Sequence, residues 1–579
     1  MQWRVLQVCM IAVAVASPPA LAQRRPVSPE RVTARTEKAP VHARHWMVVA
    51  ANPLAVDAGY RVLAQGGSAV DAAVAVQLVL GLVEPQSSGL GGGGFMLVHD
   101  TRAKRLIAYD GRETAPAAAR PDRFMKNGRP VDFYDAVLGG KSVGVPGLVR
   151  LLEDTHKKHG RLPWARLFEP AIALAENGFP MSPRLRELVG SDRYLTQPRV
   201  RAYFFDERGK VLAAGTMLRN PAYARTLRAI ARDGARAFYE GEIARDIVET
   251  VTGHPWNPGD LTLRDLAEYR VVVRDPVCGA YRVVRVCGFP PPSSGGIAIV
   301  QMLGMLERFD MASLPPASFF AVHYMSEAGR LAFADRSAYV ADPAFHPVPG
   351  GLVDPSYLRE RASLIRPDAS LGRAAPGHPP GATETRKVAD ASLDLPSTSH
   401  ISIVDRDGNA VSMTSSIEDA FGSRLMTAGG FLLNNEMTDF SFVPEAGGVP
   451  VANRIEGGKR PRSSMAPTIA YDRAGRVAIV TGSPGGPMII NFVAKALVGI
   501  VDWKLDPQAA ADLPNFGSRN GPTDLEAGTA VALLAPKLRA LGSDVVVFPM
   551  ASGLHTIART KDGWVGGADP RREGVARGQ

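Results

Sequence analysis

Residues 396–416 have the sequence PSTSHISIVDRDGNAVSMTSS. Two apolar runs with strand-like alternation, 401–404 and 410–416, are joined by an Asp-Gly turn, and this arrangement predicts a β-hairpin. The residues before it, 371–397, are rich in glycine, proline, alanine and charge and show no periodicity, so they predict an exposed loop. An exposed segment therefore runs directly into Thr398 at the head of a strand.

Cleavage of the backbone before Thr398 would give this residue two reactive groups. Its hydroxyl is a nucleophile, and its freed α-amine is a base on the same residue. Ser397 and Thr398 are therefore a candidate autocleavage site. A loop entering an ordinary strand has the same sequence pattern, so this stretch alone leaves both interpretations open.

Counting outward from the turn gives a partner for Thr398. With a three-residue turn centred on Asp407, both Thr398 and Ser416 lie nine positions from the centre. Cross-strand neighbours have Cβ atoms about 5 Å apart, so we expect the Ser416 hydroxyl to hydrogen-bond that of Thr398. Glu418 lies one alternation further on the same face. The alternative is a serine- and threonine-rich exposed face, and a register shift of one residue would turn the set away.

Composition excludes some classes of partner. The chain has 579 residues, 45% of them hydrophobic, which is enough for a large core. Its net charge is +10, but the basic residues are dispersed, with no lysine run and no interleaving with aromatic residues. This favours a solvated, mildly basic surface and no nucleic-acid partner.

The N-terminus is typical of a secretory signal peptide. Residues 1–22 contain Arg4, an apolar core at 8–16 and the sequence Ala-Leu-Ala at 20–22. Residues 23–44 are polar and basic and predict a flexible N-terminal segment. No later run is long and apolar enough to cross a membrane. The mature protein is therefore expected to be exported, either periplasmic or secreted, with no membrane span.

Only Cys278 and Cys287 remain after the signal peptide. A hairpin turning at residues 282–283 would pair them directly. An oxidising compartment would permit a disulfide, but neighbouring strand positions also carry unbonded thiols, so both states stay open. With two cysteines and no clustered histidines, neither a zinc site nor another metal or cofactor is expected.

Residues 482–486, GSPGG, precede a predicted helix from about 488 to 501. A glycine-rich turn at a helix start exposes backbone N–H groups that bind an anion or stabilise a developing oxyanion. No Lys-Ser/Thr pair follows, so this is not a nucleotide phosphate loop. The glycines would also be explained by the turn alone.

Three other polar segments flank predicted strands. Arg112 lies in a glycine-containing loop, where an arginine suits bidentate binding of a carboxylate or is simply a surface charge. Residues 434–440 mix amides with carboxylates, which bind an ammonium group or cap a loop. Ser463 and Ser464 offer two adjacent hydroxyls.

Taken in order, these motifs resemble the γ-glutamyltranspeptidases, members of the N-terminal nucleophile hydrolase superfamily. Single motifs are weak, but the ordered set is specific and runs from about residue 46 to 571. The matching segments are 66–73, 84–95, 290–296, 398–400, 432–437, 459–465, 481–486 and 567–571.

The resemblance implies a four-layer αββα sandwich, which agrees with the α+β architecture suggested by helices around paired hairpins. It also implies self-cleavage between Ser397 and Thr398 into a large subunit, residues 45–397, and a small subunit, residues 398–579. Thr398 would be the nucleophile. Its freed α-amine, with a reference pKa of about 7.7–8.0, would be the base.

The implied activity is cleavage of the γ-glutamyl amide of glutathione and related compounds through a γ-glutamyl ester on Thr398. Water, or the amine of an amino acid or peptide, would release the acyl group. By motif, Arg112 with Ser463 and Ser464 would bind the substrate α-carboxylate. Glu436 with Asp439 would bind the α-ammonium. Gly485 and Gly486 would bind the oxyanion.

The chain departs from the family pattern in three places. Ser416 stands where threonine is frequent, and Glu418 stands where asparagine is frequent. The carboxylate of Glu418 either strengthens ammonium binding or repels the substrate carboxylate. Segment 442–458 is shorter than in well-known members and has no tyrosine to cover the pocket, which favours hydrolysis and larger acyl groups.

Two rival functions follow. One is a glutaryl-cephalosporin acylase of the same superfamily, which removes β-lactam side chains. The other is an uncleaved, non-catalytic binding protein.

Overall fold

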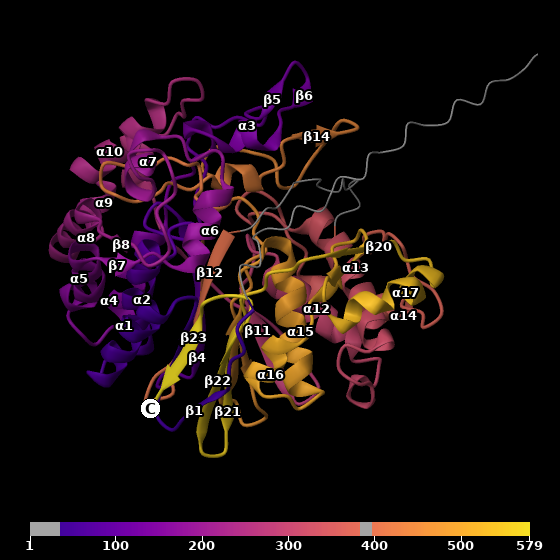
Figure 1. Ribbon diagram of the computed structural model, residues 1–579. Coiled ribbons are helices and arrows are strands. Elements are labelled where there is room, and N and C mark those ends of the chain that lie inside the picture. Colours follow the sequence, from indigo (N-terminus) through magenta and orange to yellow (C-terminus); the bar gives the residue numbers. More distant parts are fainter. Residues whose placement is uncertain (1–34, 383–396) are drawn as a thin grey trace, which may run out of the picture.

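Two facing antiparallel sheets form the centre of the computed structural model, which describes residues 35–382 and 397–579 (Figure 1). The predicted signal peptide, 1–22, and residues 23–34 lie outside the described residues. In sheet 1 the strand order is β1 (Val41–Ala43), β22 (Gly563–Ala568), β21 (His555–Thr560), β17 (Val477–Gly482), β16 (Thr468–Tyr471), β11 (Val284–Gly288) and β10 (Val277–Tyr281). In sheet 2 it is β23 (Val575–Gly578), β2 (Met47–Ala50), β12 (Ser397–Val404), β13 (Ala410–Glu418), β3 (Gly93–Asp100), β4 (Arg105–Gly111) and β9 (Val272–Arg274).

Helices cover the outer face of each sheet. Helices α2 and α4 contact strands of sheet 2, α12 and α15 contact strands of sheet 1, and β12 and β13 face β17 across the middle. Figure 1 shows the two groups of helices on opposite sides of the strands. This confirms the predicted α+β fold and its four layers. The main covering helices are α1 (Pro53–Ala64), α2 (Ala69–Val83), α4 (Leu148–His159), α12 (Gly295–Leu306), α13 (Phe319–Tyr339), α15 (Ile489–Val501) and α16 (Pro507–Asp512).

Smaller elements complete the layers and the loops around them. The remaining α-helices are α3 (Phe133–Val137), α5 (Glu169–Asn177), α6 (Pro183–Ser191), α7 (Pro198–Phe204), α8 (Pro221–Asp233), α9 (Arg236–Tyr239), α10 (Glu242–Thr252), α11 (Leu263–Glu268), α14 (Pro355–Ser363) and α17 (Ala535–Ala540). The short strands are β5 (Met125–Lys126), β6 (Arg129–Pro130), β7 (Phe179–Pro180), β8 (Met217–Leu218), β14 (Glu445–Ala446), β15 (Val449–Pro450), β18 (Phe516–Ser518), β19 (Thr523–Glu526) and β20 (Val545–Phe548).

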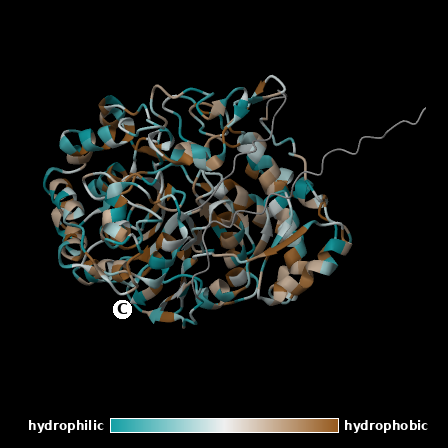
Figure 2. Cartoon of the chain, turned by 45° about the horizontal axis from the view of Figure 1, so that its top comes forward, coloured by the Kyte–Doolittle hydropathy of each residue, from teal (hydrophilic) through white to brown (hydrophobic). Residues whose placement is uncertain are grey.

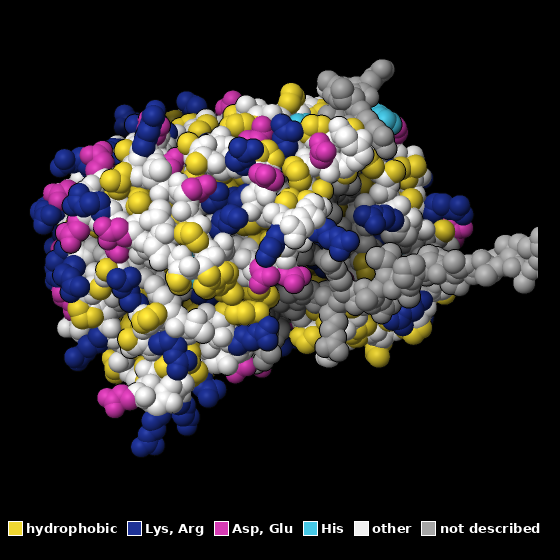
Figure 3. Space-filling model, turned by 90° about the horizontal axis from the view of Figure 1, so that it is seen from above, with side chains coloured by type: hydrophobic (Ala, Val, Ile, Leu, Met, Phe, Trp, Pro, Cys, Tyr) yellow, Lys and Arg dark blue, Asp and Glu magenta, His cyan; other side chains and the backbone are white. Residues whose placement is uncertain are grey.

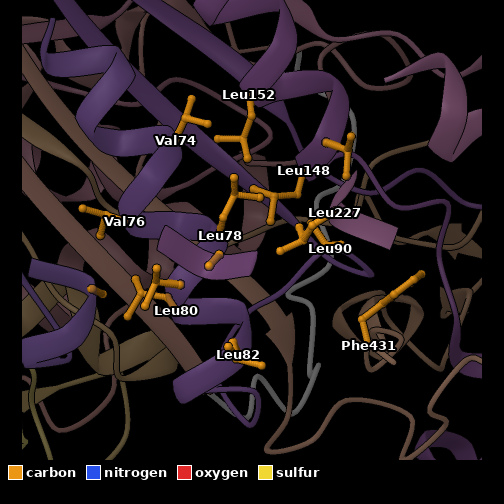
Figure 4. Close-up of a cluster of buried hydrophobic side chains, with 14 of the residues drawn as sticks. Val74, Val76, Leu78, Leu80, Leu82, Leu90, Leu148, Leu152, Leu227 and Phe431 are labelled. Atoms are coloured by element: carbon orange, nitrogen blue, oxygen red, sulfur yellow. The ribbon is translucent and has the colours of Figure 1, made fainter. Parts of the chain in front are cut away.

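Helix α2 is the centre of the core on sheet 2. It begins with a capping box, in which Ser68 Oγ accepts from the Asp71 N–H at 3.1 Å and an Asp71 carboxylate oxygen accepts from the Ser68 N–H at 2.8 Å. Almost every side chain of the helix is buried. Figure 4 shows its aliphatic side chains gathered with those of α4: Val74, Val76, Leu78, Leu80, Leu82, Leu148 and Leu152. Truncating such a leucine to alanine costs about 2–5 kcal/mol.

Hydropathy and charge follow the layers. Hydrophobic residues lie mainly on the inner elements in Figure 2. On the face seen from above in Figure 3, basic and acidic side chains are mixed, without a continuous patch of one sign. Within the described ranges no helix has the length and apolar character needed to span a bilayer.

Both predicted hairpin registers are present. Thr398 pairs with Ser416 in the β12–β13 ladder, and an irregularity lies between Ser397 and Thr398. Cys278 pairs with Cys287 between β10 and β11, and the two residues form a disulfide.

Part of the predicted flexible segment is folded. Residues 41–43 form β1, which pairs with β22. Lys38 Nζ donates to the carbonyl oxygens of Asp569 and Arg572, both at 2.7 Å. Residues 35–44 are therefore held against the C-terminal strands by contacts that lie more than 500 positions away in the sequence, which local composition does not reveal.

Candidate active site

A small cavity brings together residues from six distant segments of the chain. It contains every residue that the sequence predicted for cleavage, catalysis or substrate binding except Ser397 and Gly485, which directly precede the lining residues Thr398 and Gly486. Met465 and Ile489 add apolar surface. The full lining is Arg112, Thr398, Ser416, Glu418, Glu436, Asp439, Ser463, Ser464, Met465, Gly486 and Ile489.

The ends of strands and helices position these groups. Thr398 lies at the start of β12, and Ser416 and Glu418 lie at the end of β13. Arg112 directly follows β4, and Glu436 and Asp439 belong to a short 3-10 helix, Glu436–Asp439. The serine pair precedes β16, and Gly486 precedes α15. The site therefore lies at the end of the sheets where β12 begins, near the β12 label in Figure 1.

Ser416 contacts the bond that is predicted to be cut. Its Oγ donates to the Ser397 carbonyl oxygen at 2.6 Å and accepts from the Glu418 N–H at 2.8 Å. We expected a bond to the Thr398 hydroxyl, and that detail is wrong for the uncleaved chain. The register shift between Ser397 and Thr398 explains the difference, because it brings the preceding carbonyl to Ser416.

Arg112 is surrounded by carboxylates. Its guanidinium donates to Glu436 through Nη1 and to Asp439 through Nη2, and its exposed fraction is 1%. It also donates to the carbonyl oxygens of Pro461 and Arg462, both at 3.3 Å. In the uncleaved chain, therefore, the group expected to bind a substrate carboxylate is paired with the two groups expected to bind an ammonium.

The carboxylates around Arg112 exceed its single positive charge. Burial raises the pKa of Glu436 to about 8, although the Arg112 charge opposes this. Burial likewise raises the pKa of Glu113 to about 7, again against Arg112, whose Nη1 lies 3.9 Å away. The cluster therefore holds protons near neutral pH and would ionise fully if a second cation entered.

Glu418 has an unusual environment. Its φ is +76°, its Oε2 accepts from Asn435 Nδ2, and its Oε1 has no hydrogen-bond partner among the described residues. Burial raises the pKa of Glu418 well above its ordinary value, and the charges of Asp439, Asp419 and Glu436 add to the effect. Burial thus favours the protonated form of this carboxyl, which has a donor and an acceptor as an amide does.

The glycine turn has the geometry of a backbone anion site. Gly485 has φ +133° and Gly486 has φ +53°, in the region that favours glycine. A Cβ on Gly485 would lie 2.6 Å from the Phe492 ring, so a side chain does not fit there. The turn leads through a 3-10 helix, Gly486–Met488, into α15, whose positive dipole end faces the turn.

Asn435, within the segment 434–440 already considered, supports Glu418. Two other supporting residues escaped the sequence analysis. Glu113 directly follows Arg112, but nothing in the sequence marked its side chain as part of the cluster. Arg336, on α13, donates to Ser464 Oγ and to Ser294 Oγ, both at 2.8 Å, and so fixes the serine pair. No local signal links α13 to residue 464.

Comparison with known proteins places this geometry in a family. The profile of the family described as Gamma-glutamyltranspeptidase matches residues 55–579. The chain is 35% identical to the glutathione hydrolase proenzyme of Bacillus subtilis (strain 168), over 92% of this chain and 91% of that protein. It is 36% identical to the acylase ACY 1 proenzyme of Pseudomonas sp. (strain SE83), over 94% and 95%.

Solved structures agree with this placement. A cephalosporin acylase from Bacillus halodurans matches with a TM-score of 0.82 and 28% identity, covering 94% of this chain and 97% of that one. The sequence match spans nearly the whole chain, and the fold and order of motifs are shared. This protein is therefore a member of the gamma-glutamyltranspeptidase family.

Proposed function

We propose that this protein is an exported γ-glutamyl hydrolase and transpeptidase that matures by cleavage between Ser397 and Thr398. The observation that carries the proposal is the shared cavity. One small space holds Thr398, whose α-amine cleavage would free, the Gly485–Gly486 turn and a guanidinium within a carboxylate cluster. These are the groups needed to attack an amide and to bind an α-amino acid head group.

Maturation uses the Ser397–Thr398 peptide as its own substrate. Thr398 Oγ1 attacks the Ser397 carbonyl carbon, the carbon–nitrogen bond breaks, and the nitrogen keeps the hydroxyl proton as an amine. Water then hydrolyses the resulting ester and leaves a carboxylate on Ser397 and a free α-amine on Thr398. The Ser416 hydroxyl, at 2.6 Å from the Ser397 oxygen, stabilises the oxyanion formed during the attack.

Turnover repeats the attack on a substrate. The neutral α-amine of Thr398 takes the hydroxyl proton, and Oγ1 bonds to the γ-carbonyl carbon of the substrate. The Gly485 and Gly486 amides stabilise the oxyanion, and the leaving amine departs with the proton. Water or an acceptor amine then attacks the ester and restores Thr398. Glutathione is the proposed donor, and amino acids or peptides are the proposed acceptors.

The charges in the cavity favour a γ-glutamyl group over a glutaryl group. The two differ by one α-ammonium. Glu113, Glu436 and Asp439 lie around Arg112, and Glu418 lines the same cavity, so the site lacks positive charge for a bare dicarboxylate. An entering ammonium would pair with Glu436 and Asp439, and Arg112 would become available for the α-carboxylate.

A matched pair of substrates tests this choice. γ-Glutamyl-p-nitroanilide and glutaryl-p-nitroanilide have the same leaving group and differ only in the α-ammonium. We expect kcat/KM to be about ten- to a hundredfold higher for the γ-glutamyl compound, since a charged hydrogen bond contributes about 1.5–3 kcal/mol. Thr398→Ala is the control for background hydrolysis. A preference for the glutaryl compound would contradict the proposal.

The acylase alternative has its own support. The B. halodurans cephalosporin acylase has the high structural similarity given above, and the Pseudomonas acylase is as similar in sequence as the glutathione hydrolases. Glutaryl-7-aminocephalosporanic acid, offered beside glutathione, measures this activity directly. Release of its side chain with a higher kcat/KM than glutathione hydrolysis would select the acylase.

N-terminal sequencing separates both enzymes from a binding protein. Purified mature protein should contain a second chain that begins with Thr398, Ser399 and His400. A single full-length band after prolonged incubation would support the non-catalytic alternative. Sequencing of the larger chain from the native host would also test export, because loss of residues 1–22 is expected.

A further inference from the structure

A second and larger recess lies at the other end of the two sheets. It is formed by the loop before β2 and by the turns that join β3 to β4, β12 to β13 and β16 to β17, together with β11, β21 and β22. Its volume is about 690 Å³. We call it the basic recess and define it by its cationic lining residues: Arg44, Lys104, Arg285, Arg406, Arg476 and Arg559.

Most of these cations have no acidic partner. Arg476 pairs with Asp472 at 2.8 Å. In the part of the chain that the structure describes, the other five cations form no ion pair. Unpaired cations of one sign repel one another, and an enclosed anion would remove that repulsion.

The two carboxylates in the lining are engaged elsewhere. Asp405 is buried and accepts from the N–H groups of Ala69, Asp407 and Asn409 at 2.9–3.1 Å. Asp407 pairs with Arg161, outside the recess. Neither is therefore available to neutralise the six cations.

Aromatic rings hold three of the arginines in place. The guanidinium of Arg285 lies 4.7 Å from the Tyr471 ring centroid, that of Arg559 lies 4.1 Å from Trp564, and that of Arg406 lies 4.8 Å from Trp46. A stacked guanidinium keeps its edge N–H groups free for planar oxyanions. The positions are therefore fixed before any ligand enters, which reduces the entropic cost of binding.

A histidine lies among the arginines of the basic recess, and their charges affect its pKa. His99 lines the recess, and its Nδ1 lies 3.1 Å from the Tyr471 hydroxyl. Burial lowers the pKa of His99, and the charges of Arg559 and Arg285 lower it further, against Asp100. His99 is thus neutral at physiological pH and adds a polar group rather than another charge.

We propose that the basic recess binds a small anion with several clustered oxyanion groups, of the phosphate or polycarboxylate class. The recess is concave, its cations converge from both sheets, and its volume exceeds that of a single phosphate. A flat basic surface would suit a membrane or a nucleic acid instead, but a hollow between turns suits a compact ligand.

Pyrophosphate and citrate are the probes, because they carry similar charge on different oxyanion groups. Isothermal titration calorimetry with the full-length protein should show saturable binding of at least one of them, and its melting temperature should rise with the concentration of that probe. The probe that binds more tightly identifies the class. Absence of saturable binding for both would overturn the proposal.

Variants locate the binding. Arg285→Gln and Arg559→Gln should each weaken the binding about tenfold, as expected for one charge-assisted contact. Arg129→Gln, on β6 at the opposite end of the molecule in Figure 1, is the matched control and should bind as the parent does. Equal weakening in all three, or unchanged binding in the Arg285/Arg559 double variant, would refute the site.

Folding of the variants needs its own check, because Arg559 Nε also donates to the Val477 carbonyl oxygen at 2.7 Å. Arg285 is an exposed residue, so Arg285→Gln is not expected to disturb folding. Near-UV circular dichroism of each variant should match the parent. If Arg559→Gln fails this test, Arg406→Gln replaces it with the same expectation.

Discussion

The two ends of strand β12 lie in opposite electrostatic environments. At its start, Thr398 lines a small cavity in which Glu113, Glu436 and Asp439 surround Arg112 and Glu418 lies on the same wall. At its end, the turn after Val404 forms part of the basic recess, where cations face solvent without acidic partners. Strand geometry separates the two ends by about 25 Å. This distance is about three Debye lengths at physiological salt, so solvent ions screen the charges at one end from those at the other.

The difference lies in desolvation as much as in sign. Charges at the catalytic end are buried, so each must be paired with an opposite charge, neutralised by protonation, or paired with a charged substrate when one binds. Apart from Arg559, which is half-buried, the cations at the basic end are exposed, so leaving them unpaired costs less than it would in the buried cluster. Substitutions of similar chemistry should therefore have very different effects at the two ends.

The largest effect is expected at Thr398. Thr398→Ala should abolish both chain cleavage and turnover, because it removes the only group proposed to attack in either reaction. Denaturing electrophoresis and p-nitroaniline release measure the two. Thr398→Ser keeps a hydroxyl and should retain slow cleavage. Turnover by the alanine variant would show that another residue attacks.

Removing the cation of the buried cluster should destabilise the fold. Arg112→Gln removes the cation that pairs with Glu436 and Asp439, and breaking a buried ion pair in this way costs about 3–5 kcal/mol. Arg285→Gln at the basic end should change stability by less than about 0.5 kcal/mol. Urea denaturation compares the two. The loss for Arg112→Gln should shrink at acid pH, where protonation neutralises the carboxylates; a pH-independent loss would contradict this account.

Ser416 should act mainly on maturation. Ser416→Ala removes the donor to the Ser397 carbonyl and should slow cleavage about 10²–10³-fold, as for loss of one oxyanion donor. Ser416→Thr retains the hydroxyl and should mature at a similar rate to the parent. The time course of the small subunit on denaturing gels measures both. Cleavage of the alanine variant at the parental rate would exclude this role.

A smaller effect is expected in the pH profile. Ammonium binding requires ionised carboxylates, and burial raises the pKa of Glu436 to about 8 and that of Glu113 to about 7. The KM for a γ-glutamyl substrate should therefore fall as pH rises through this range, by at most about tenfold per pH unit for each group. Glu113→Gln should remove the lower step and keep the upper one. A KM that is constant between these pKa values would show that the cluster is already ionised.

Sequence reasoning predicted the pairing of residues within hairpins, but it missed contacts between residues on different strands or layers of the fold. The pairings of Thr398 with Ser416 and of Cys278 with Cys287 followed from counting around a turn, since antiparallel strands fix the register. The bulge at Ser397 changed the partner of Ser416 without changing that register. Bulges of this kind are set by neighbouring strands and leave no reliable local signal.

The site was harder to assemble than the fold. Arg112 lies more than 320 positions from the acidic residues it contacts, so no periodicity or spacing connects them. Family resemblance supplied that connection. The pairing of Arg112 with carboxylates and the raised pKa of Glu418 depend on burial, which the sequence pattern does not measure. Both changed the interpretation of the site, because they reduce the net charge expected from its residue types.

The arrangement of the strands also determines how a cut chain holds together. Strands from before residue 397 and from after it alternate in sheet 2, where β12 lies against β2 and β13 against β3, and sheet 1 joins β11 to β16. The disulfide lies wholly within the first piece. After scission the two polypeptides would nevertheless remain interlocked through shared hydrogen-bond ladders, co-purify without a covalent link and melt in one transition.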